Sequence, residues 1–448
     1  MAEAVNTIYY KRAVITSLDG SQTVDLSKAI QRFNYFENIL EHSITATIEI
    51  KSSYSYVNQL PIRGGERVDI ELLTSFGKSS GPDAGFNLTG DTPLFVYKVS
   101  DRKIIRMVEE CTLHLTSLEN FSNDSTRCLR KYQKLKISSH VEDILKNTLQ
   151  TKKDINIEPT ANSYSFIGNS KKPFYTISWL GSKSISQVTE VSGVSGKDKL
   201  GKNKGTAGFL FYENKKGFHF RSIDSLVSNA QLQNQSSDIE PKISYNFSGK
   251  IIEEAKLYNS LKIIDVNFPK NIDLRKALAI GMYSNDFYYY DTRKNEVSLY
   301  NYNLKEEIQS STKLGNEESL TVNSEFANIP TRTMFRTSDH GTLDPSGSLT
   351  ESQSDSGGDA MLAKSSSRIN LLFTQSLNIL VPLNVELTIG DFIYCEFPKF
   401  EGGGAMEVDD QSSGNYVIRK LCHHFEAGAS TSSLTLMRDS YGLYGPNQ

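Results

Sequence analysis

The chain has 448 residues, enough for two to four domains, and its composition of 38% hydrophobic and 23% charged residues is that of an ordinary soluble protein. A net charge of −3 excludes a molecule that binds nucleic acid electrostatically over its whole surface. No stretch approaches the roughly 18 apolar residues of a membrane span, and the N-terminus lacks the pattern of a secretory signal. The four cysteines form no CxxC pair, so we expect them to be reduced and buried in a protein made in the cytosol.

Residues 1–120 alternate apolar and polar side chains in several short runs. In "SITATIEI" (Ser43–Ile50) the isoleucines share one face. "RVDIELL", "LFVYKVS" and "CTLHLTSL" follow, and a Gly/Ser/Pro-rich loop, Gly77–Pro93, separates the first two. Short strands between turn clusters predict a small antiparallel barrel or sandwich.

Residues 121–207 change to helical periodicity. In "ISSHVEDILKNTL" Ser139 precedes Glu142 by three residues, which is a capping-box pattern. The apolar positions of this helix fall on one face: Val141, Ile144, Leu145 and Leu149. "FYTISWLGSKSISQVTEVS" predicts a second helix, with Ile177, Leu180, Ile185 and Val188 roughly in phase. The basic stretch Ser192–Gly208 is typical of a flexible, solvated loop.

The segment "GFLFYENKKGFHFRSIDSL" (Gly208–Leu226) predicts a hairpin with its turn at Asn214–Gly217, where the glycine supplies a positive φ. Alternation places Phe209 and Phe211 on one face, and it places Leu210 and Tyr212 on the other. Both faces therefore need a cover. For the second face we expect the middle domain or a neighbouring subunit.

Further strands are predicted in "SLKIIDVNF", "NDFYYYDT" and "EVSLYNYNL". The stretch 338–367 is poor in apolar residues and rich in Ser, Gly and Asp, which is typical of a long mobile loop. "SRINLLFTQSL" is compatible with a short helix, and the chain then returns to strands in "NVELTIGDFIYCEF", "NYVIRKLCHHF" and "SSLTLMRDS".

The two ends of the chain contain similar sequence patterns. "GERVDIEL" (Gly65–Leu72) aligns with "GDFIYCEF" (Gly390–Phe397), and "FVYK" (Phe95–Lys98) aligns with "YVIR" (Tyr416–Arg419). From there the spacing to "CTLHLTSL" and to "SSLTLMRD" is identical without a gap. We interpret this as a duplicated β unit, two similar barrels in one chain, with chance similarity of two β regions as the alternative.

Motifs for chemistry are absent from the sequence. No phosphate-binding loop, GxSxG or HExxH occurs, and the seven histidines are scattered. In "CHHF" Cys422 and His424 share a strand face, with His423 opposite, but no second cluster completes a metal site. The acidic pairs lie on predicted helix faces or in loops. We therefore expect no catalytic residue, no cofactor and no metal ligand, and we interpret the tyrosine-rich strands as packed against another chain.

The segments quoted above, in this order, resemble the hub proteins of contractile phage tail baseplates, and equally the hub part of type VI secretion spike proteins and the late-control proteins. "FLFYENKKGFHFRSIDSL" resembles the hairpin of that family, and the segments that follow its order are "ERVDIELL", "KLKISSHVEDIL", "PFYTISWLGSKS", "VELTIGDFIYCEFP" and "GNYVIRKLCHHFE" with "SSLTLMRDSYG". The resemblance covers most of the chain except about 245–367. It implies a mainly β fold of two tube-like antiparallel β-barrels with an inserted α/β domain.

The resemblance further implies a homotrimeric virion protein at the centre of the tail baseplate, made in the host cytoplasm and without membrane insertion. The trimer would adapt a six-fold tail tube to a trimeric central spike. It would contact the tail tube protein, the spike, the inner baseplate wedge proteins and the tape-measure protein, and DNA would pass through its channel without specific binding. Because nothing resembling a spike helix or a lysozyme-like region follows "DSYGLYGPNQ", we expect the spike to be a separate chain.

The boundaries that follow are 1–120 for the first barrel, 208–245 and 368–448 for the second, 121–207 and 246–337 for the middle and inserted domain, and 338–367 for the loop. The predicted subunit or partner contacts are Phe209, Phe211, Tyr212, Phe218, Phe220, Arg221, Tyr288 and Tyr290.

Two alternatives remain at this point. A tail-borne peptidoglycan hydrolase would need an acid pair or a nucleophile–base constellation in a cleft. A peripheral tail protein that binds sugars through its tyrosines would lie off the tail axis.

Overall fold

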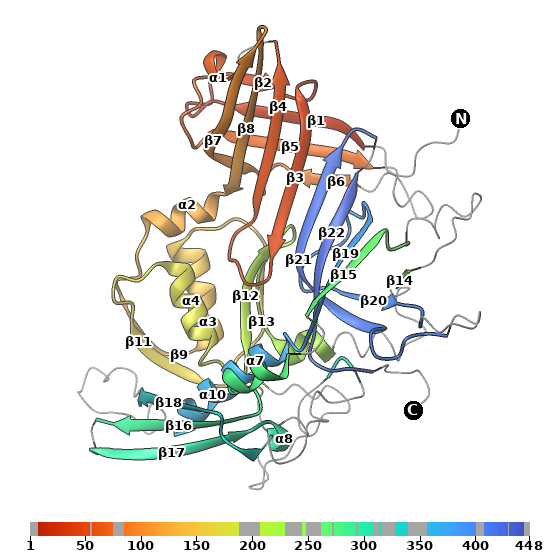
Figure 1. Ribbon diagram of the computed structural model, residues 1–448. Helices are drawn as coiled ribbons and strands as arrows, with labels where there is room; N and C mark the ends of the chain where they lie inside the picture. The colour runs from red at the N-terminus through yellow and green to blue at the C-terminus, as the bar shows by residue number, and fades with distance from the viewer. Residues whose placement is uncertain are drawn as a thin grey trace.

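The computed structural model describes residues 8–53, 56–74, 85–187, 207–228, 244–247, 261–270, 273–292, 294–307, 313–315, 328–338, 356–399, 407–428 and 430–442. Over these residues the protein is mainly β, and its sheets are mostly antiparallel (Figure 1). No helix within these ranges has the length and apolarity to cross a membrane.

One large sheet runs through both ends of the chain. Its N-terminal half has the strand order β3-β4-β8-β7-β5-β1-β2, with β6 on the side of β5. The bounds are β1 (Ile8–Thr16), β2 (Thr23–Asp25), β3 (Ile30–Asn38), β4 (Thr45–Ser52), β5 (Arg67–Thr74), β6 (Gly85–Leu88), β7 (Leu94–Ile105) and β8 (Val108–Ser117), with the short helix α1 (Tyr56–Gln59) between β4 and β5.

The C-terminal half has the order β15-β19-β22-β21-β20-β14, and β21 also pairs with β3, which joins the halves. The bounds are β14 (Ser244–Asn246), β15 (Asp265–Lys270), β19 (Gln375–Pro382), β20 (Phe392–Glu396), β21 (Gly414–Glu426) and β22 (Thr431–Arg438). Among the described strand pairs of this half, β14·β20 is parallel and the others are antiparallel. Among the described residues, neither half forms a closed sheet.

The two halves repeat one strand order. The N-terminal half has the spatial order β3-β4-β8-β7-β5-β1, and the C-terminal half has the matching order β15-β19-β22-β21-β20-β14. The matching strands also follow each other in the same order along the chain. Both β7·β8 and β21·β22 contain a bulge, between Val96 and Lys98 and between Ile418 and Lys420. The orientation of β14 on β20 is the one pairing that differs, since β1·β5 is antiparallel.

A mixed α/β region follows the N-terminal half in the chain. In Figure 1 it lies below that half and to the left of the C-terminal half. It contains α2 (Leu118–Ser125), β9 (Lys131–Lys136), α3 (Ile137–Asp143), the π-helix η1 (Ile144–Thr148), β10 (Ile155–Ile157), β11 (Ser163–Ile167), α4 (Pro173–Gly181), β12 (Phe209–Asn214) and β13 (Gly217–Ser222). β9 pairs with β11, and the hairpin β12–β13 pairs through β13 with β10 in parallel. The sequence placed this hairpin in the second barrel, whereas its backbone extends the sheet of the middle region.

A smaller sheet, β17-β16-β18, lies apart from the large one at the lower left of Figure 1. The elements here are α7 (Leu274–Ala279), β16 (Ser284–Asp291), β17 (Glu296–Asn303), α8 (Leu304–Glu307), β18 (Arg332–Thr337) and α10 (Ser356–Leu371). Phe287 and Tyr289 of β16 are buried together with Ala363 of α10.

The three largest apolar cores among the described residues belong to the large sheet and the middle region. One belongs to the N-terminal half of the large sheet and takes in Leu383, Val385 and Phe425 from the C-terminal half. A second belongs to the C-terminal half. The third is formed by the middle region, where helix residues pack on the aromatic side chains of the hairpin.

Several expectations need correction. The helix at residue 137 is confirmed, and Val141, Ile144, Leu145 and Leu149 are buried, but the capping box is wrong because the helix begins after Lys136 without a side-chain cap. The second helix ends at Gly181, so Ile185 lies beyond it, and Val188 is outside the described residues.

The predicted loops also need correction. Residues 356–367 of the predicted loop 338–367 belong to α10, while residues 339–355 lie outside the described part. Within the predicted loop Gly77–Pro93, residues 85–88 form β6. Most of the predicted loop Ser192–Gly208 lies outside the described ranges.

Candidate functional site: the hairpin junction

The hairpin β12–β13 lies between the middle core and the core of the C-terminal strands, and every residue of β12 is buried. The predicted turn is confirmed, and its register pairs Asn214 with Gly217, so only two residues form the loop. Phe209 and Phe211 pack in the middle core. On the other face Leu210 and Tyr212 pack in the core of the C-terminal strands. The second face is thus covered by this chain's own C-terminal half.

Gly217 makes this tight junction possible. Its φ is +123°, a region that other residues rarely adopt, and an added Cβ would lie 2.1 Å from the carbonyl oxygen of Asp154. The amide of Phe218 donates to that same carbonyl over 2.9 Å. The glycine therefore lets the turn dock against the loop that leads into β10.

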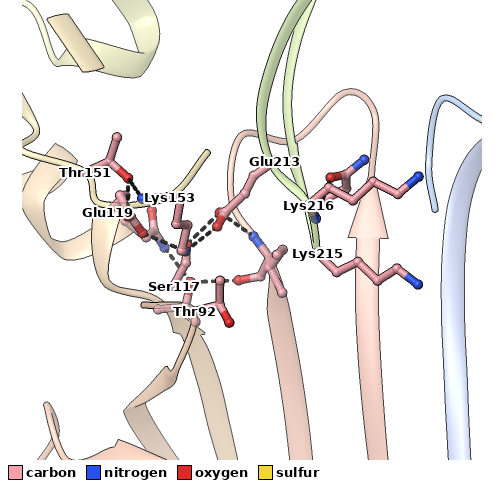
Figure 2. Close-up of polar contacts among 12 residues, drawn as sticks. Thr92, Ser117, Glu119, Thr151, Lys153, Glu213, Lys215 and Lys216 are labelled. Carbon is pink, nitrogen blue, oxygen red and sulfur yellow. Dashed lines mark hydrogen bonds and ion pairs between the residues drawn. The ribbon is translucent and has the colours of Figure 1, made fainter. Parts of the chain in front are cut away.

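A buried ion cluster links the hairpin to the middle region. The ammonium of Lys153 donates to Glu119 over 2.7 Å and also to Glu213, and all three side chains are at most 6% exposed. Thr151 donates to the other oxygen of Glu119 over 2.6 Å. Figure 2 shows Lys153 between the two carboxylates. One cation thus holds α2 and β12 to the loop after η1.

Glu213 also reaches the N-terminal half of the large sheet. Its second oxygen accepts from the hydroxyl of Ser117 over 2.7 Å and from the amide of Ile44 over 3.0 Å (Figure 2). This carboxylate therefore ties the hairpin, the loop before β4 and the end of β8 together. Because it is buried without solvent, the loss of any partner leaves an unsatisfied polar group.

The electrostatics of this cluster follow from two acids sharing one base. Burial disfavours the ammonium of Lys153, but the carboxylates of Glu213 and Glu119 outweigh it, so the pKa of Lys153 is raised. Burial raises the pKa of Glu213; Lys153 opposes the rise and Glu119 adds to it. The cluster therefore depends on its lysine to keep two carboxylates in an apolar setting.

Glu37, on β3, holds the other side of the hairpin. It accepts from the hydroxyl of Tyr35 and the amide of Lys215, each over 2.7 Å, and from the amide of Ile389 over 3.0 Å. Burial raises its pKa to about 7, although these three donors favour the carboxylate. Glu37 therefore joins the two halves of the large sheet to the hairpin turn.

A second ion cluster fixes the chain that follows the hairpin. The guanidinium of Arg368, on α10, donates to Asp224 and to Asp439, each over 2.9 Å, and all three side chains are at most 10% exposed. The amide of Leu314 donates to the other oxygen of Asp439 over 2.9 Å. α10 is thereby held against the end of β22.

Of the residues predicted as subunit contacts, five are buried inside the single chain: Phe209, Phe211, Tyr212, Phe218 and Phe220. Arg221 and Tyr288 are half-buried, and Tyr290 is 42% exposed. Tyr288 stacks on Phe335 of β18 with centroids 5.0 Å apart. The aromatic hairpin and the tyrosine strands thus lie in different parts of the fold, and their role in a contact with another chain stays a prediction.

The histidine and cysteine positions have ordinary structural roles. Cys422 and His424 do share a face, with Cys422 Sγ 3.6 Å from His424 Nδ1. The same ring nitrogen is hydrogen-bonded to Asn34 Oδ1 over 2.8 Å. His423, on the opposite face, is fully buried, which lowers its pKa to about 3. All four cysteines are free, and Cys422 is half-buried. Within the described ranges no three metal-ligating side chains gather.

The sequence interpretation missed Glu37 and Glu213. Each is a single acid inside an aromatic strand, in "FNYFEN" and in "FLFYEN". An ionisable residue in a run whose neighbours are buried on both faces is the signal that points to a paired, buried charge. Their partners could not be read in the same way, because Lys153 is 60 residues from Glu213 and Ile389 is 352 residues from Glu37.

No protein-family model and no curated protein matches the sequence of this chain. Among solved structures, a tail protein from Neisseria meningitidis MC58 matches with a TM-score of 0.52 and 9% identity over 96% of each chain. Prophage tail protein gp18 from Listeria monocytogenes EGD-e gives 0.49 at 9% identity, over 98% of this chain and 96% of that one. A Francisella PdpA–VgrG complex gives 0.44 at 10% identity, over 97% of this chain and 52% of that one.

Of these three, only the Neisseria protein exceeds a TM-score of 0.5, and at 9% identity it establishes the fold and no more. The chain therefore has the fold of a tail protein. The resemblance to tail proteins that was drawn from the sequence is thereby confirmed at the level of the fold.

Proposed function

We propose that this protein is a baseplate hub, a structural virion protein that acts as a homotrimeric adaptor at the centre of a contractile tail. One observation carries the proposal: the strand order of the large sheet occurs twice in one chain, in the same sequence order. A chain with two similar β units lets three copies present six similar surfaces. Such an object fits a six-fold tube on one side and a three-fold spike on the other.

Each half of the large sheet, with its own core, would form one tube-like β-barrel in the assembled ring. The middle region and the smaller sheet would make the inserted domain. The net charge of −3 suits a channel wall past which DNA slides without binding. The partners would be the tail tube protein, the central spike protein, the inner wedge proteins and the tape-measure protein, and the location would be the baseplate centre.

The hairpin junction supports a structural rather than a catalytic role. Its carboxylates are neutralised or hydrogen-bonded and sealed from solvent, so they cannot meet a substrate. Buried charge clusters of this kind fix the relative orientation of the elements they join. We propose that the junction sets the angle between the two β units.

The tail-axis location is testable in the particle. Quantitative mass spectrometry of purified tails should give three copies of this chain for each spike trimer, and antibody labelling should mark the end of the tail axis. Six or more copies, or label at the baseplate rim, would contradict the proposal. A rim location would favour the sugar-binding alternative, for which the stack of half-buried Tyr288 on the exposed Phe335 is the supporting observation.

A further inference from the structure

Two strand edges of the large sheet, one on β7 and one on β15, lack a strand partner over part or all of their length within the described residues. β7 pairs with β8 along one edge, but on its other edge β5 pairs only with Leu94 and Phe95. The stretch from Tyr97 to Ile105 has no strand on that side. At the far end β15 pairs with β19 on one edge only. A bare edge is a template for an added strand.

The molecule contains one filled version of such an edge. β21 is the counterpart of β7, but on the corresponding edge it has two partners in succession. Its first residues pair with β20 through Val417, and its later residues, Lys420–Glu426, pair antiparallel with β3. In this pairing Phe425 lies opposite Phe33, and their rings stack with centroids 5.2 Å apart.

The pairing registers identify the counterparts of Phe425 and Phe33. The ungapped alignment of the two ends places Ile104 of β7 at the position of Phe425. Phe33 pairs with Ile48 on β4, and Val266 of β15 pairs with Ile379 on β19.

Those two inner residues correspond through the next strand. Ile48 pairs with Leu113, and Ile379 pairs with Leu434, its counterpart in the ungapped alignment. Val266 is therefore the counterpart of Phe33.

Burial shows which version is complete. Phe425 is fully buried, whereas Ile104 at the same position is 67% exposed and Ile105 is 56% exposed. At the other edge Ile264 is 50% exposed and Phe268 is 37% exposed. Both bare edges thus present apolar side chains where the filled edge has a core.

We propose that copies of this chain join head to tail by pairing β7 of one copy with β15 of the next. The pairing is antiparallel, with Ile104 opposite Val266, and it repeats between chains the β21·β3 junction within the chain. This rests on the proposed ring of hub subunits and specifies its contact. Such a contact joins two different surfaces of the chain. Repeating it closes a ring when the rotation between neighbouring copies divides a full turn evenly. Backbone hydrogen bonds supply affinity, and the alternate side chains set the register.

Cysteine cross-linking of the full-length chain tests the register. Directly opposed residues have Cβ atoms about 4.5–5.5 Å apart, near the reach of a disulfide. The double variant Ile104→Cys/Val266→Cys should form, on mild oxidation, a ladder of covalently joined chains that ends at the closed ring. Each single variant should form none. A matched control, Ile104→Cys with Leu299→Cys on the separate small sheet, should also remain unlinked.

A charge substitution gives a second readout by light scattering. Ile104→Asp should weaken association at least about tenfold, because it buries a carboxylate in the new sheet. Met107→Asp, in the adjacent turn and 86% exposed, should leave association unchanged.

The outcomes separate the contact from the ring. A ring that forms normally but neither cross-links nor responds to Ile104→Asp overturns this edge pairing and leaves the hub proposal intact. A wild-type chain that stays single at high concentration overturns both.

Discussion

Replacing Lys153 by methionine should destabilise the middle region strongly. The change removes the ammonium that contacts both Glu119 and Glu213, and the pair of carboxylates stays in a site where neither is more than 6% exposed. Breaking a buried ion pair by removing one partner costs about 3–5 kcal/mol. Since 1.4 kcal/mol is a factor of ten, the folded fraction of this region should fall by at least about a hundredfold relative to the unfolded one.

The assay is urea unfolding followed by the fluorescence of Trp179. This is the only tryptophan of the chain, and it packs against the middle core, so it reports on that region directly. The control is Lys146→Met, which removes an exposed partner of Glu142 and should change stability by no more than about 0.5 kcal/mol. The cost of Lys153→Met should shrink as the pH falls, because the carboxylates can then take up protons. A cost below about 1 kcal/mol, or one independent of pH, would refute the reasoning.

Two further predictions concern the hairpin. Because the pKa of Glu37 rises from 4.5 to about 7 on folding, its contribution favours the folded state at low pH and is lost as the pH increases through this window, by up to about 3 kcal/mol. The variant Glu37→Gln should not lose this stability. The free energy of unfolding of the variant, minus that of the wild type, should therefore increase from pH 4.5 to pH 8. A difference that does not change with pH would argue against a buried, titrating carboxyl. Gly217→Ala should lower the free energy of unfolding by at least about 2 kcal/mol, because the position combines a positive φ with a 2.1 Å clash of the added Cβ. The control Gly20→Ala has a positive φ but open space, and it should cost about 1 kcal/mol in thermal or urea unfolding. Equal costs would show that the docking contact is unimportant.

Alternation and turn chemistry predicted the strands and the hairpin well. The run Ser43–Ile50 overlaps β4, Thr45–Ser52, and Gly217 at the end of the hairpin turn has the expected positive φ. Such features depend on residues near each other in the sequence, so the pattern carries them. The repeat of the two ends was visible for the same reason, as a spacing between "FVYK" and "CTLHLTSL" that recurs near the C-terminus.

Features that depend on distant partners were not predictable in this way. Residues 356–367 have the composition of a loop, yet they belong to α10, because small residues such as Ala363 allow the helix to pack closely on Phe287 and Tyr289. Glu213 is isolated in its strand, and only the folded chain brings Lys153 to it. Local propensity cannot encode such tertiary contacts.

The central claim is that one chain supplies two β units to a ring. A cryo-electron microscopy reconstruction of the purified full-length protein, calculated without imposed symmetry, tests it most directly. We expect three copies around an axis, with the two halves of the large sheet alternating as six similar walls around a channel. A ring in which the C-terminal half of the sheet lies away from the channel, or an assembly with another number of copies, would contradict the account.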